Sequence, residues 1–281
     1  MTDSLNISRG PLILGAGGRL GKGLFSLWKA GHLPELGAPH WQSRSAPDMQ
    51  NWDFSRDRPP DRLAPRGMIV LAGVTSGSDA ALAANAALAL AACDLALQLN
   101  IGPVLLLSSA AVYGRAAGPQ AEALNPLPAN AYGSAKLEME RAVASHAARP
   151  CCLRSANVAG FDALFGAAGR GPVQLDQFAD GSSPRRAYIG PLSLGRCLAT
   201  LLAAPSLPPL LNLAAPSTAS MSAILQAAQL EWTWVSAPQS ALRDVSLDTG
   251  LLQSIAPVPA AANLAETLVS QARLAGWTPW L

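Results

Sequence analysis

Short apolar runs with the length of buried strands alternate with helical segments along the first 160 residues of the chain. We expect strands at residues 11–14, 40–43, 68–72, 104–108 and 151–155. Between them, apolar residues recur at helical spacing, which predicts helices at residues 20–30, 78–99 and 131–146. Such alternation is typical of α/β proteins whose parallel strands are joined by right-handed crossovers. The chain is therefore expected to form an α/β fold around a parallel sheet.

The pattern loosens after Gly160, where glycine and proline interrupt the chain repeatedly. Helices are expected at residues 192–204, 221–230 and 263–274, and short strands at residues 210–213 and 232–235. The change of pattern predicts that a first structural unit ends near residue 160.

The composition limits the classes of protein to which the chain can belong. Of its 281 residues, 50% are hydrophobic and 14% are charged, which provides a large core and excludes a disordered chain. The net charge of +2 is spread without a run of like charges. We therefore expect neither nucleic acid nor an anionic membrane surface as a partner.

Four cysteines lie in apolar stretches: Cys93, Cys151, Cys152 and Cys197. They have neither CxxC spacing nor histidine partners, so we expect no metal site and free thiols in a reducing compartment. The first ten residues lack the basic flank and apolar core of a signal peptide, which indicates the cytoplasm. The alanine-rich residues 80–99 include Asn85 and Asp94, and we expect a helix of the folded protein there rather than a membrane span.

Three glycines stand three residues apart where the first strand gives way to a helix: Gly15, Gly18 and Gly21. Glycine at these places lets the backbone approach a pyrophosphate at the positive end of the helix. The alternative is a purely structural glycine turn. The position of the turn directly after the first buried strand favours nucleotide binding.

Tyr132 and Lys136 lie four residues apart in an expected helix, so both side chains project from one face. A nearby ammonium stabilises a phenolate and brings the tyrosine pKa closer to neutral pH, where the hydroxyl exchanges a proton with a carbinol or carbonyl. A lysine can also hydrogen-bond a cofactor ribose. The alternative is a coincidental pair, which is the weaker interpretation because the chain has only three tyrosines.

Ser108 and Ser109 end the expected strand that precedes Gly114. Hydroxyls at the carboxyl end of a parallel strand face the crevice in which α/β sheets bind ligands. Taken alone, the two serines are better interpreted as a cap for the strand end.

Together these segments resemble the extended short-chain dehydrogenase/reductase family, in its NAD-dependent epimerase/dehydratase branch. The matching segments are the GAGGRLG turn from Gly15, SSAAVYG from Ser108, YGSAK from Tyr132 and LRSANVAG from Leu153. The resemblance implies a Rossmann-type, doubly wound parallel sheet that binds NAD(P) over residues 1–160. It also implies a small C-terminal substrate lobe over residues 161–281, some segments of which return to the Rossmann core.

The same resemblance implies roles for individual residues. Tyr132 would be the catalytic acid/base, Lys136 would modulate it and bind the ribose, and Ser109 would hold the substrate oxygen. Asn157 and Arg186 would contact the substrate. The other cofactor-binding residues that it implies are Gly15, Gly18, Leu20, Gly21, Asp53, Phe54, Leu71, Ala72, Gly73, Asn85 and Ser155.

The second strand departs from the family pattern at the cofactor ribose. NAD-specific members usually end this strand with an acidic residue, whereas here it runs from His40 through Ser43 to Arg44 without a carboxylate. A guanidinium at Arg44, assisted by Arg19, offers a planar set of donors to a 2′-phosphate. NADP is therefore the expected cofactor, with NAD as the alternative.

Two further departures concern the reaction. Dehydratases of this branch carry an acidic pair directly after the catalytic hydroxyl, where this chain has Ala110 and Ala111, so elimination of water is disfavoured. The substrate region is short, and Gly190 and Ser193 replace the histidine and aspartate that often follow an arginine such as Arg186. Whether the substrate carries a nucleoside diphosphate is left open.

We therefore expect an NADP-preferring oxidoreductase that moves hydride, without a metal, between the nicotinamide and a secondary alcohol or ketone of a sugar-like or nucleotide-sugar substrate. One alternative is a sugar epimerase that retains its cofactor. Another is a non-catalytic NAD(P)-binding regulatory protein, against which the intact set of Ser109, Tyr132 and Lys136 argues.

The expected helix at residues 78–99 is apolar around nearly its whole circumference, although a helix on a sheet needs one apolar stripe. We expect the remaining alanine surface, together with the Tyr132 helix, to pack against a second copy in a two-fold homodimer. Ala87 is expected to point outward in this interface. The alternative is an exposed alanine surface that is tolerated because alanine favours the helix.

Overall fold

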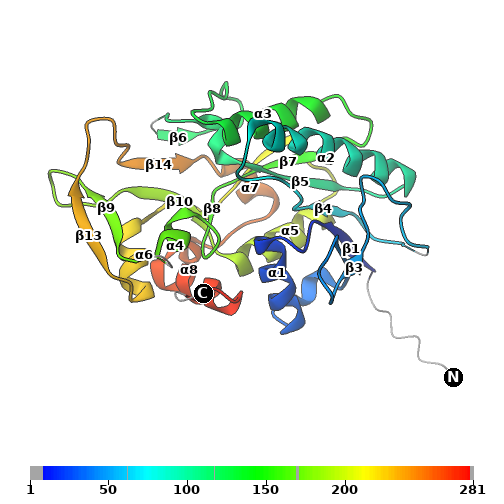
Figure 1. Cartoon of the computed structure of the whole chain (residues 1–281), viewed down its shortest axis with the longest axis horizontal. Coiled ribbons are helices and arrows are strands. Elements are labelled where there is room, and N and C mark those ends of the chain that lie inside the picture. Colours follow the sequence, from blue (N-terminus) through cyan, green and yellow to red (C-terminus); the bar gives the residue numbers. More distant parts are fainter. Residues whose placement is uncertain (1–8, 62, 117, 169–170, 279–281) are drawn as a thin grey trace.

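A computed structural model describes residues 9–61, 63–116, 118–168 and 171–278 (Figure 1). Residues 1–8, on which the expectation of a cytoplasmic protein partly rests, lie outside this part. The centre of the molecule is a seven-stranded parallel sheet in the order β11-β7-β5-β4-β1-β2-β3. Its strands are β1 (Arg9–Leu14), β2 (Ala38–Ser43), β3 (Gln50–Asn51), β4 (Met68–Val70), β5 (Val104–Ser109), β7 (Cys151–Ser155) and β11 (Leu210–Leu213).

Helices cover both faces of this sheet, as Figure 1 shows. The helices α2 (Asp79–Gln98) and α3 (Ala131–Val143) pack on the face to which Leu12, Leu14 and Leu106 point. The helices α1 (Arg19–Lys29) and α5 (Pro191–Ala203) cover the opposite face, with Ile13 and Leu105 between them and the sheet. Successive residues of β1 and β5 thus point to opposite layers, which is why these strands are continuously apolar. The Rossmann-type, doubly wound α/β fold is confirmed.

Most of the expected elements have close counterparts. The strands at 151–155 and 210–213 have the expected bounds, whereas β4 ends at Val70 rather than at residue 72. The residues after Val70 leave the sheet and line the cavity described below. The long helix begins at Asp79 because the Ser78 hydroxyl accepts a hydrogen bond from the backbone N–H of Ala81.

A smaller lobe lies beside the sheet, at the left of Figure 1. One of its sheets has the order β12-β10-β14-β6, with β8 paired to β10, and a second joins β13 to β9. Its strands are β6 (Gly118–Gln120), β8 (Asn157–Val158), β9 (Val173–Gln177), β10 (Arg185–Ile189), β12 (Thr218–Ser220), β13 (Trp232–Ser236) and β14 (Asp244–Leu247). Its helices are α4 (Ala163–Ala168), α6 (Met221–Ala228) and α8 (Ala265–Leu274), which share an apolar core with β9.

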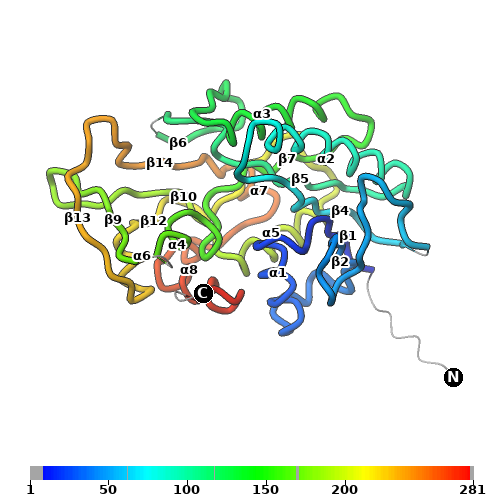
Figure 2. Tube along the Cα trace, viewed as in Figure 1, coloured from blue at the N-terminus to red at the C-terminus, as the bar shows by residue number. Residues whose placement is uncertain are grey.

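The chain crosses between the two parts several times, as the trace in Figure 2 shows. After β10 it returns to the large sheet to form α5 and β11, and later it forms α7 (Gly250–Ile255), whose Leu252 packs in the core beneath that sheet. Three short 3₁₀ turns complete the connections: η1 (Pro34–Leu36), η2 (Ala110–Tyr113) and η3 (Ala260–Asn263). The C-terminal half therefore supplies part of the Rossmann core.

In length and composition, α2 is the one described helix that could cross a membrane. In this structure it packs on the sheet instead. Its buried residues include Leu82, Ala89, Cys93 and Ala96, and the helix contacts β4, β5 and α3.

Candidate active site

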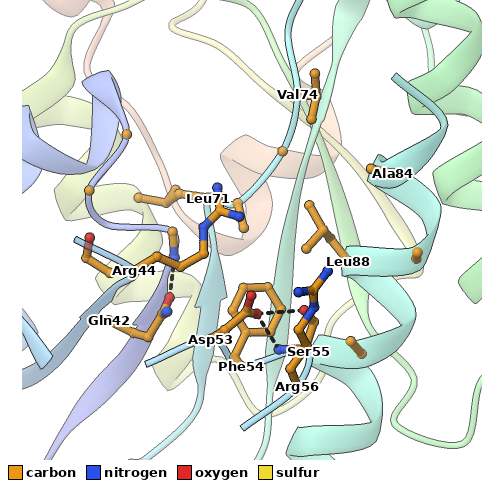
Figure 3. A pocket seen from close by; sticks show the side chains of 18 of the residues that line it. Gln42, Arg44, Asp53, Phe54, Ser55, Arg56, Leu71, Val74, Ala84 and Leu88 are labelled. Atoms are coloured by element: carbon orange, nitrogen blue, oxygen red, sulfur yellow. Dashed lines mark hydrogen bonds between the residues drawn. The ribbon is translucent and has the colours of Figure 1, made fainter. Parts of the chain in front are cut away.

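A cavity of about 720 Å³ opens at the carboxyl ends of β1, β2 and β4 (Figure 3). Ligands of open α/β sheets bind at this edge, where the direction of strand order reverses. Eight of the expected cofactor-binding residues line the cavity: Gly15, Gly18, Arg44, Asp53, Phe54, Leu71, Ala72 and Gly73. These residues are spread over almost 60 positions of the sequence, from Gly15 to Gly73, and the fold brings them together.

The glycine turn fits closely against its neighbours. Gly15 has a φ of +75°, and a Cβ there would lie 2.5 Å from the Ala72 backbone. A Cβ on Gly21 would lie 2.4 Å from the Ala16 carbonyl oxygen, so Gly21 permits the close packing of α1 rather than lining the cavity. Gly18 precedes α1 as its N-cap, at the positive end of the helix dipole. The turn therefore presents backbone and open space to an anion.

Gln42 and Ser43 hold the end of β2 beside this turn. The Gln42 side chain is buried, and its Oε1 accepts a hydrogen bond from the Gly15 N–H at 2.9 Å while its Nε2 donates to the Trp52 carbonyl. The Ser43 hydroxyl accepts from the N–H groups of Ser45 and Ala46 at 3.2 and 3.0 Å. The end of β2 is thereby built from the neutral side chains of Gln42 and Ser43, and Arg44 follows it.

Two arginines and one aspartate bring charge to the same cavity. Figure 3 shows Asp53 between Arg44, which points toward Leu71, and Arg56, which points toward Leu88. The Asp53 carboxylate accepts hydrogen bonds from the Ser55 hydroxyl at 2.6 Å and from the Ser55 N–H at 3.0 Å. The hydrogen bond from the Ser55 hydroxyl, assisted by the positive charges of Arg56 and Arg44, lowers the pKa of Asp53. Asp53 is therefore an ionised acceptor near neutral pH.

Asn85 lies behind the cavity and fixes the loop that follows β4. Its Oδ1 accepts from the Val74 N–H at 3.1 Å, and its Nδ2 donates to the carbonyls of Val74 and Leu82 at 3.0 and 2.8 Å. A Cβ on Gly73 would lie 2.7 Å from Asn85 Oδ1 and 3.1 Å from Lys136 Nζ. Gly73, which lines the cavity, thus lies against both Asn85 and Lys136.

Tyr132 and Ser109 meet across α3 and the end of β5. Burial raises the pKa of the Tyr132 hydroxyl, and a hydrogen bond with the Ser109 side chain acts in the opposite direction. The Ser109 hydroxyl also accepts from the Ala111 N–H at 3.1 Å, which caps η2. Ser109 therefore caps the end of the strand, and its side chain also contacts the tyrosine.

Lys136 is 4% exposed, and its ammonium donates to the Leu107 carbonyl at 2.9 Å. Its other contact is the Met139 sulfur, at 3.8 Å. Within the described residues, the ammonium has no second oxygen acceptor although it carries three protons. Burial lowers the pKa of Lys136 to about 8, while Cys152 and Glu140 act to raise it. Lys136 does not line the cavity, but its ammonium lies against Gly73, which does.

A buried polar network stands behind these catalytic candidates. Glu140, one turn after Lys136, accepts from Arg154 at 2.8 Å and from the Ser108 hydroxyl at 2.5 Å. Arg154 also donates to the Tyr113 hydroxyl, which donates in turn to the Asn212 Oδ1 at 2.8 Å. The network joins α3, β5, β7, η2 and β11, so it fixes the strand end that carries Ser109 against the helix that carries Tyr132 and Lys136.

The catalytic candidates Ser109, Tyr132 and Lys136 do not line the cavity, and neither do the remaining expected residues. Arg19 is exposed on the first turn of α1, and Leu20 packs on the core. The Ser155 hydroxyl donates to the Ala156 carbonyl at 3.0 Å, and Asn157 lies in β8 opposite Tyr188 of β10. Arg186 donates to the carbonyls of Arg185 and Leu242 at 2.8 and 3.0 Å, and burial lowers its pKa.

Sequence reasoning missed several residues that line the cavity. These are Gly17, Gln42, Ser43, Ser45, Ser55, Arg56, Val74, Ala84, Ala87, Leu88 and Ala91. Ala87, which was expected to point outward, is exposed, and it also lines the cavity. Of these residues, Gly17 could most readily have been predicted from the sequence, because it stands inside the glycine turn. A Cβ there would lie 2.3 Å from the Ser43 hydroxyl.

The model of the NAD dependent epimerase/dehydratase family matches residues 12–172. Among solved structures, UDP-glucose 4-epimerase from Brucella ovis in complex with NAD has a TM-score of 0.75 and 18% identity, covering 96% of this chain and 99% of that one. MoeE5 in complex with UDP-glucuronic acid and NAD has a TM-score of 0.69 and 20% identity, with 94% and 99% covered. RMD from Pseudomonas aeruginosa complexed with NADPH has a TM-score of 0.70 and 18% identity, with 94% and 99% covered. None of the curated proteins compared with the chain matches it in sequence.

Proposed function

Because the chain belongs to the NAD-dependent epimerase/dehydratase family, whose members are enzymes, we propose that it is an NADP-preferring oxidoreductase acting on a sugar-like or nucleotide-sugar substrate. The observation that carries the cofactor preference is the guanidinium of Arg44 in a cavity whose strand end offers Ser43 and no carboxylate. A planar guanidinium suits a 2′-phosphate, whereas a ribose diol is usually held by an acidic residue.

A nicotinamide dinucleotide fits the residues that are present. Gly15 and Gly17 leave room that a Cβ would fill, and the start of α1 favours a pyrophosphate. Among the described residues, the buried ammonium of Lys136 has one oxygen acceptor, the Leu107 carbonyl, for its three protons. When bound, the cofactor would supply a hydride donor or acceptor. Solved structures similar to this chain contain NAD in two of the three cases above and NADPH in the third, so the fold accommodates either cofactor.

Three side chains would carry out the proton chemistry. Tyr132 would give a proton to the oxygen of a ketone or take one from the alcohol, at its phenolic hydroxyl. Ser109, already hydrogen-bonded to Tyr132, would orient that oxygen. The positive charge of Lys136 would favour the phenolate, and its free protons would bind the ribose. Positioning and a single proton transfer are the contributions of the chain itself.

The substrate would lie between this set and the smaller lobe, which we propose binds it. Residues 1–160 would then form the cofactor-binding unit, and residues 161–281 would form mainly the substrate lobe. Arg186 is half-buried in β10 and its recorded bonds go to backbone carbonyls, so its charge is not neutralised by a carboxylate within 4 Å in the described part of the chain. Such a group, together with Asn157, would suit a phosphate-bearing or hydroxyl-rich substrate.

A second candidate is an epimerase that retains its cofactor. The similarity to two sugar-nucleotide 4-epimerases favours it, with TM-scores of 0.75 and 0.74. Dehydration is disfavoured because Ala110 and Ala111 carry no proton donor beside Ser109. Net consumption of NADPH distinguishes the two candidate functions, because an epimerase returns the hydride to the sugar and leaves free NADPH unchanged.

The test is a thermal-shift screen of keto sugars and nucleotide sugars with NADPH, followed by absorbance assays of each compound that stabilises the protein. We expect NADPH to be consumed with a keto sugar, and Tyr132→Phe to lose turnover while it still binds NADPH. Isomerisation of a sugar without net change in NADPH would instead establish the epimerase. Turnover by Tyr132→Phe at the parental rate would contradict the proposed mechanism.

We also propose that the protein works as a cytoplasmic homodimer. A groove of about 440 Å³ runs between α2 and α3 on the outer surface, lined by Leu82, Ala83, Ala86, Ala135 and three polar residues among others. Small side chains let a helix of a second copy approach closely. The α2 residues that line this groove differ from those that line the cavity.

A further inference from the structure

We propose that Arg56 closes the far end of the cavity by laying its guanidinium against the adenine ring of the bound dinucleotide. The inference rests on the proposed function, because it requires a dinucleotide in the cavity. It concerns the half of the ligand that takes no part in the reaction. Arg56 would be a binding residue for adenosine in either cofactor, distinct from the role proposed for Arg44.

The cavity has a direction that α2 defines. Four residues of this helix line it, and Ala84 and Ala91 mark its two ends along the helix, separated by about 10 Å at the rise of an α-helix. The Ala84 end adjoins Asn85, which holds the Val74 loop, and the neighbouring Gly73 adjoins Lys136. The reacting end of a dinucleotide would therefore lie near Ala84. Its adenosine would lie toward Ala91.

The adenosine end has the walls that a flat heterocycle needs. Leu88 and Ala91 of α2 form one apolar side, and Phe54 lies at the base, while Asp53 supplies an ionised acceptor at the edge. Figure 3 shows the Arg56 side chain pointing toward Leu88 across this space. A guanidinium stacks on an aromatic face through its planar, weakly hydrated surface. Arg56 is placed to cover the ring on the side that Leu88 leaves open.

Arg44 and Arg56 do not serve the same part of the ligand. Arg44 points toward Leu71, on the β4 side, whereas Arg56 points toward Leu88, on the α2 side, and Asp53 lies between them. Both charges lower the pKa of Asp53, so each lies within electrostatic range of this carboxylate. A 2′-phosphate bound by Arg44 would therefore leave Arg56 for the base.

The loop after β3 presents Arg56 to the cavity and leaves its side chain available. The Arg56 N–H donates to the Asp53 carbonyl at 3.0 Å, and the Asp53 N–H donates to the Asp57 carboxylate at 2.7 Å, which closes a turn. Within the described residues, no carboxylate lies within 4 Å of the Arg56 guanidinium. Arg58, two residues later, differs because it lies 3.8 Å from Asp61 and does not line the cavity.

The test compares Arg56→Gln with the matched control Arg58→Gln by calorimetric titration of the full chain. The probes are ADP-ribose, NADH and NADPH, because ADP-ribose carries the adenine but neither nicotinamide nor a 2′-phosphate. We expect Arg56→Gln to weaken all three by the same factor, about three- to tenfold. Arg58→Gln should bind all three as the parent does. Arg56→Lys should recover only part of the loss, since an ammonium has the charge but no plane.

If Arg56→Gln loses affinity for NADPH alone, the proposal is overturned and Arg56 is assigned to the 2′-phosphate. Equal affinities in Arg56→Gln and Arg58→Gln would overturn it as well. A parent that binds ADP-ribose but prefers NADH would contradict the cofactor preference proposed above, while the comparison of the two variants would still decide the role of Arg56. Failure of the parent to bind ADP-ribose at millimolar concentration would contradict both.

Discussion

The guanidinium of Arg154 lies 2.8 Å from the carboxylate of Glu140, and both side chains are at most 5% exposed. Glu140 stands one turn after Lys136 on α3, and Arg154 lies beside Ser108 in the register of β7 and β5. The Ser108 hydroxyl donates to the same carboxylate. The pair therefore ties the helix of the proposed acid/base to the strand that carries Ser109.

Breaking this ion pair should destabilise the protein strongly. Arg154→Met leaves the carboxylate of Glu140 buried without a counter-charge, so we expect the free energy of unfolding to fall by about 3–5 kcal/mol in urea denaturation. Replacing both partners, as in Glu140→Leu with Arg154→Met, should recover much of the loss because no charge is then buried alone. The control is Arg141→Met, which breaks the exposed pair with Glu138 and should change stability by about 0.5 kcal/mol or less. Equal effects of Arg154→Met and Arg141→Met would contradict the buried pair.

Gly17 should tolerate a side chain only when Ser43 is made smaller. A Cβ at residue 17 would lie 2.3 Å from the Ser43 hydroxyl oxygen and 3.2 Å from its Cβ. We expect Gly17→Ala to weaken NADPH about tenfold or more, because the glycine turn must shift at the pyrophosphate site. Adding Ser43→Ala removes the closer contact and should restore part of the affinity. If Gly17→Ala binds NADPH as the parent does, the close approach between the turn and β2 is wrong.

The central strands β1, β4 and β5 could be predicted because each contains a continuous apolar run that is buried on both faces. The edge strand β3, with two exposed polar residues, was not predicted. The lobe was harder to predict. Its strands β10, β12 and β14 have only three to five residues each, and they mix arginine, serine and threonine with apolar residues. Their pairing joins segments that are far apart in sequence, such as Val245 with Gly118. No local sequence pattern indicates which of these strands pair with one another.

The residues of the candidate site likewise divide into those that a local sequence pattern predicts and those that it does not. The motif residues Gly15, Tyr132 and Lys136 were recognisable because their spacing is local. Arg56 and the α2 residues that line the cavity carry no local signal, since only the tertiary fold brings the loop after β3 opposite that helix. Periodicity showed that α2 is apolar all round but not which side faces the ligand. Ala87, for example, is exposed as expected, but its place at the cavity could not be predicted.

NADPH binding should weaken as the pH rises through about 8. Burial lowers the pKa of Lys136 to about 8, while Glu140 and Cys152, the groups that face it from α3 and β7, act to raise it. The ribose hydroxyls would accept from the ammonium, so binding favours the protonated form, and above pH 8 the free protein must take up a proton to bind. We expect the Kd to rise by up to about tenfold per pH unit between pH 8 and pH 9.5.

This pH dependence can be checked by titrating NADPH against the parent and Lys136→Met at pH 7, 8, 9 and 9.5. The variant should bind more weakly at pH 7 and show no such rise, because it has no group to lose a proton. A parent whose affinity stays constant across this range would contradict the role of the ammonium.

The dimer and the cofactor should respond to different residues of α2. Ala83 lines the outer groove between α2 and α3, whereas Ala87, one turn later, lines the cavity. We expect Ala83→Glu to give monomers in light scattering while it still binds NADPH, because a carboxylate would be buried in the interface. Ala87→Glu should remain dimeric and lose NADPH. A parent that is monomeric at micromolar concentration would contradict the homodimer.

The most direct test of the central claim is the affinity of the parent and of Arg44→Ala for NADPH and NADH, measured side by side at one ionic strength. A charge-assisted contact with the 2′-phosphate contributes about 1.5–3 kcal/mol, which corresponds to tenfold or more in affinity. We expect the parent to bind NADPH at least about tenfold more tightly than NADH, and Arg44→Ala to lose this difference by weakening NADPH alone. Tighter binding of NADH by the parent, or equal weakening of both cofactors in Arg44→Ala, would contradict the account.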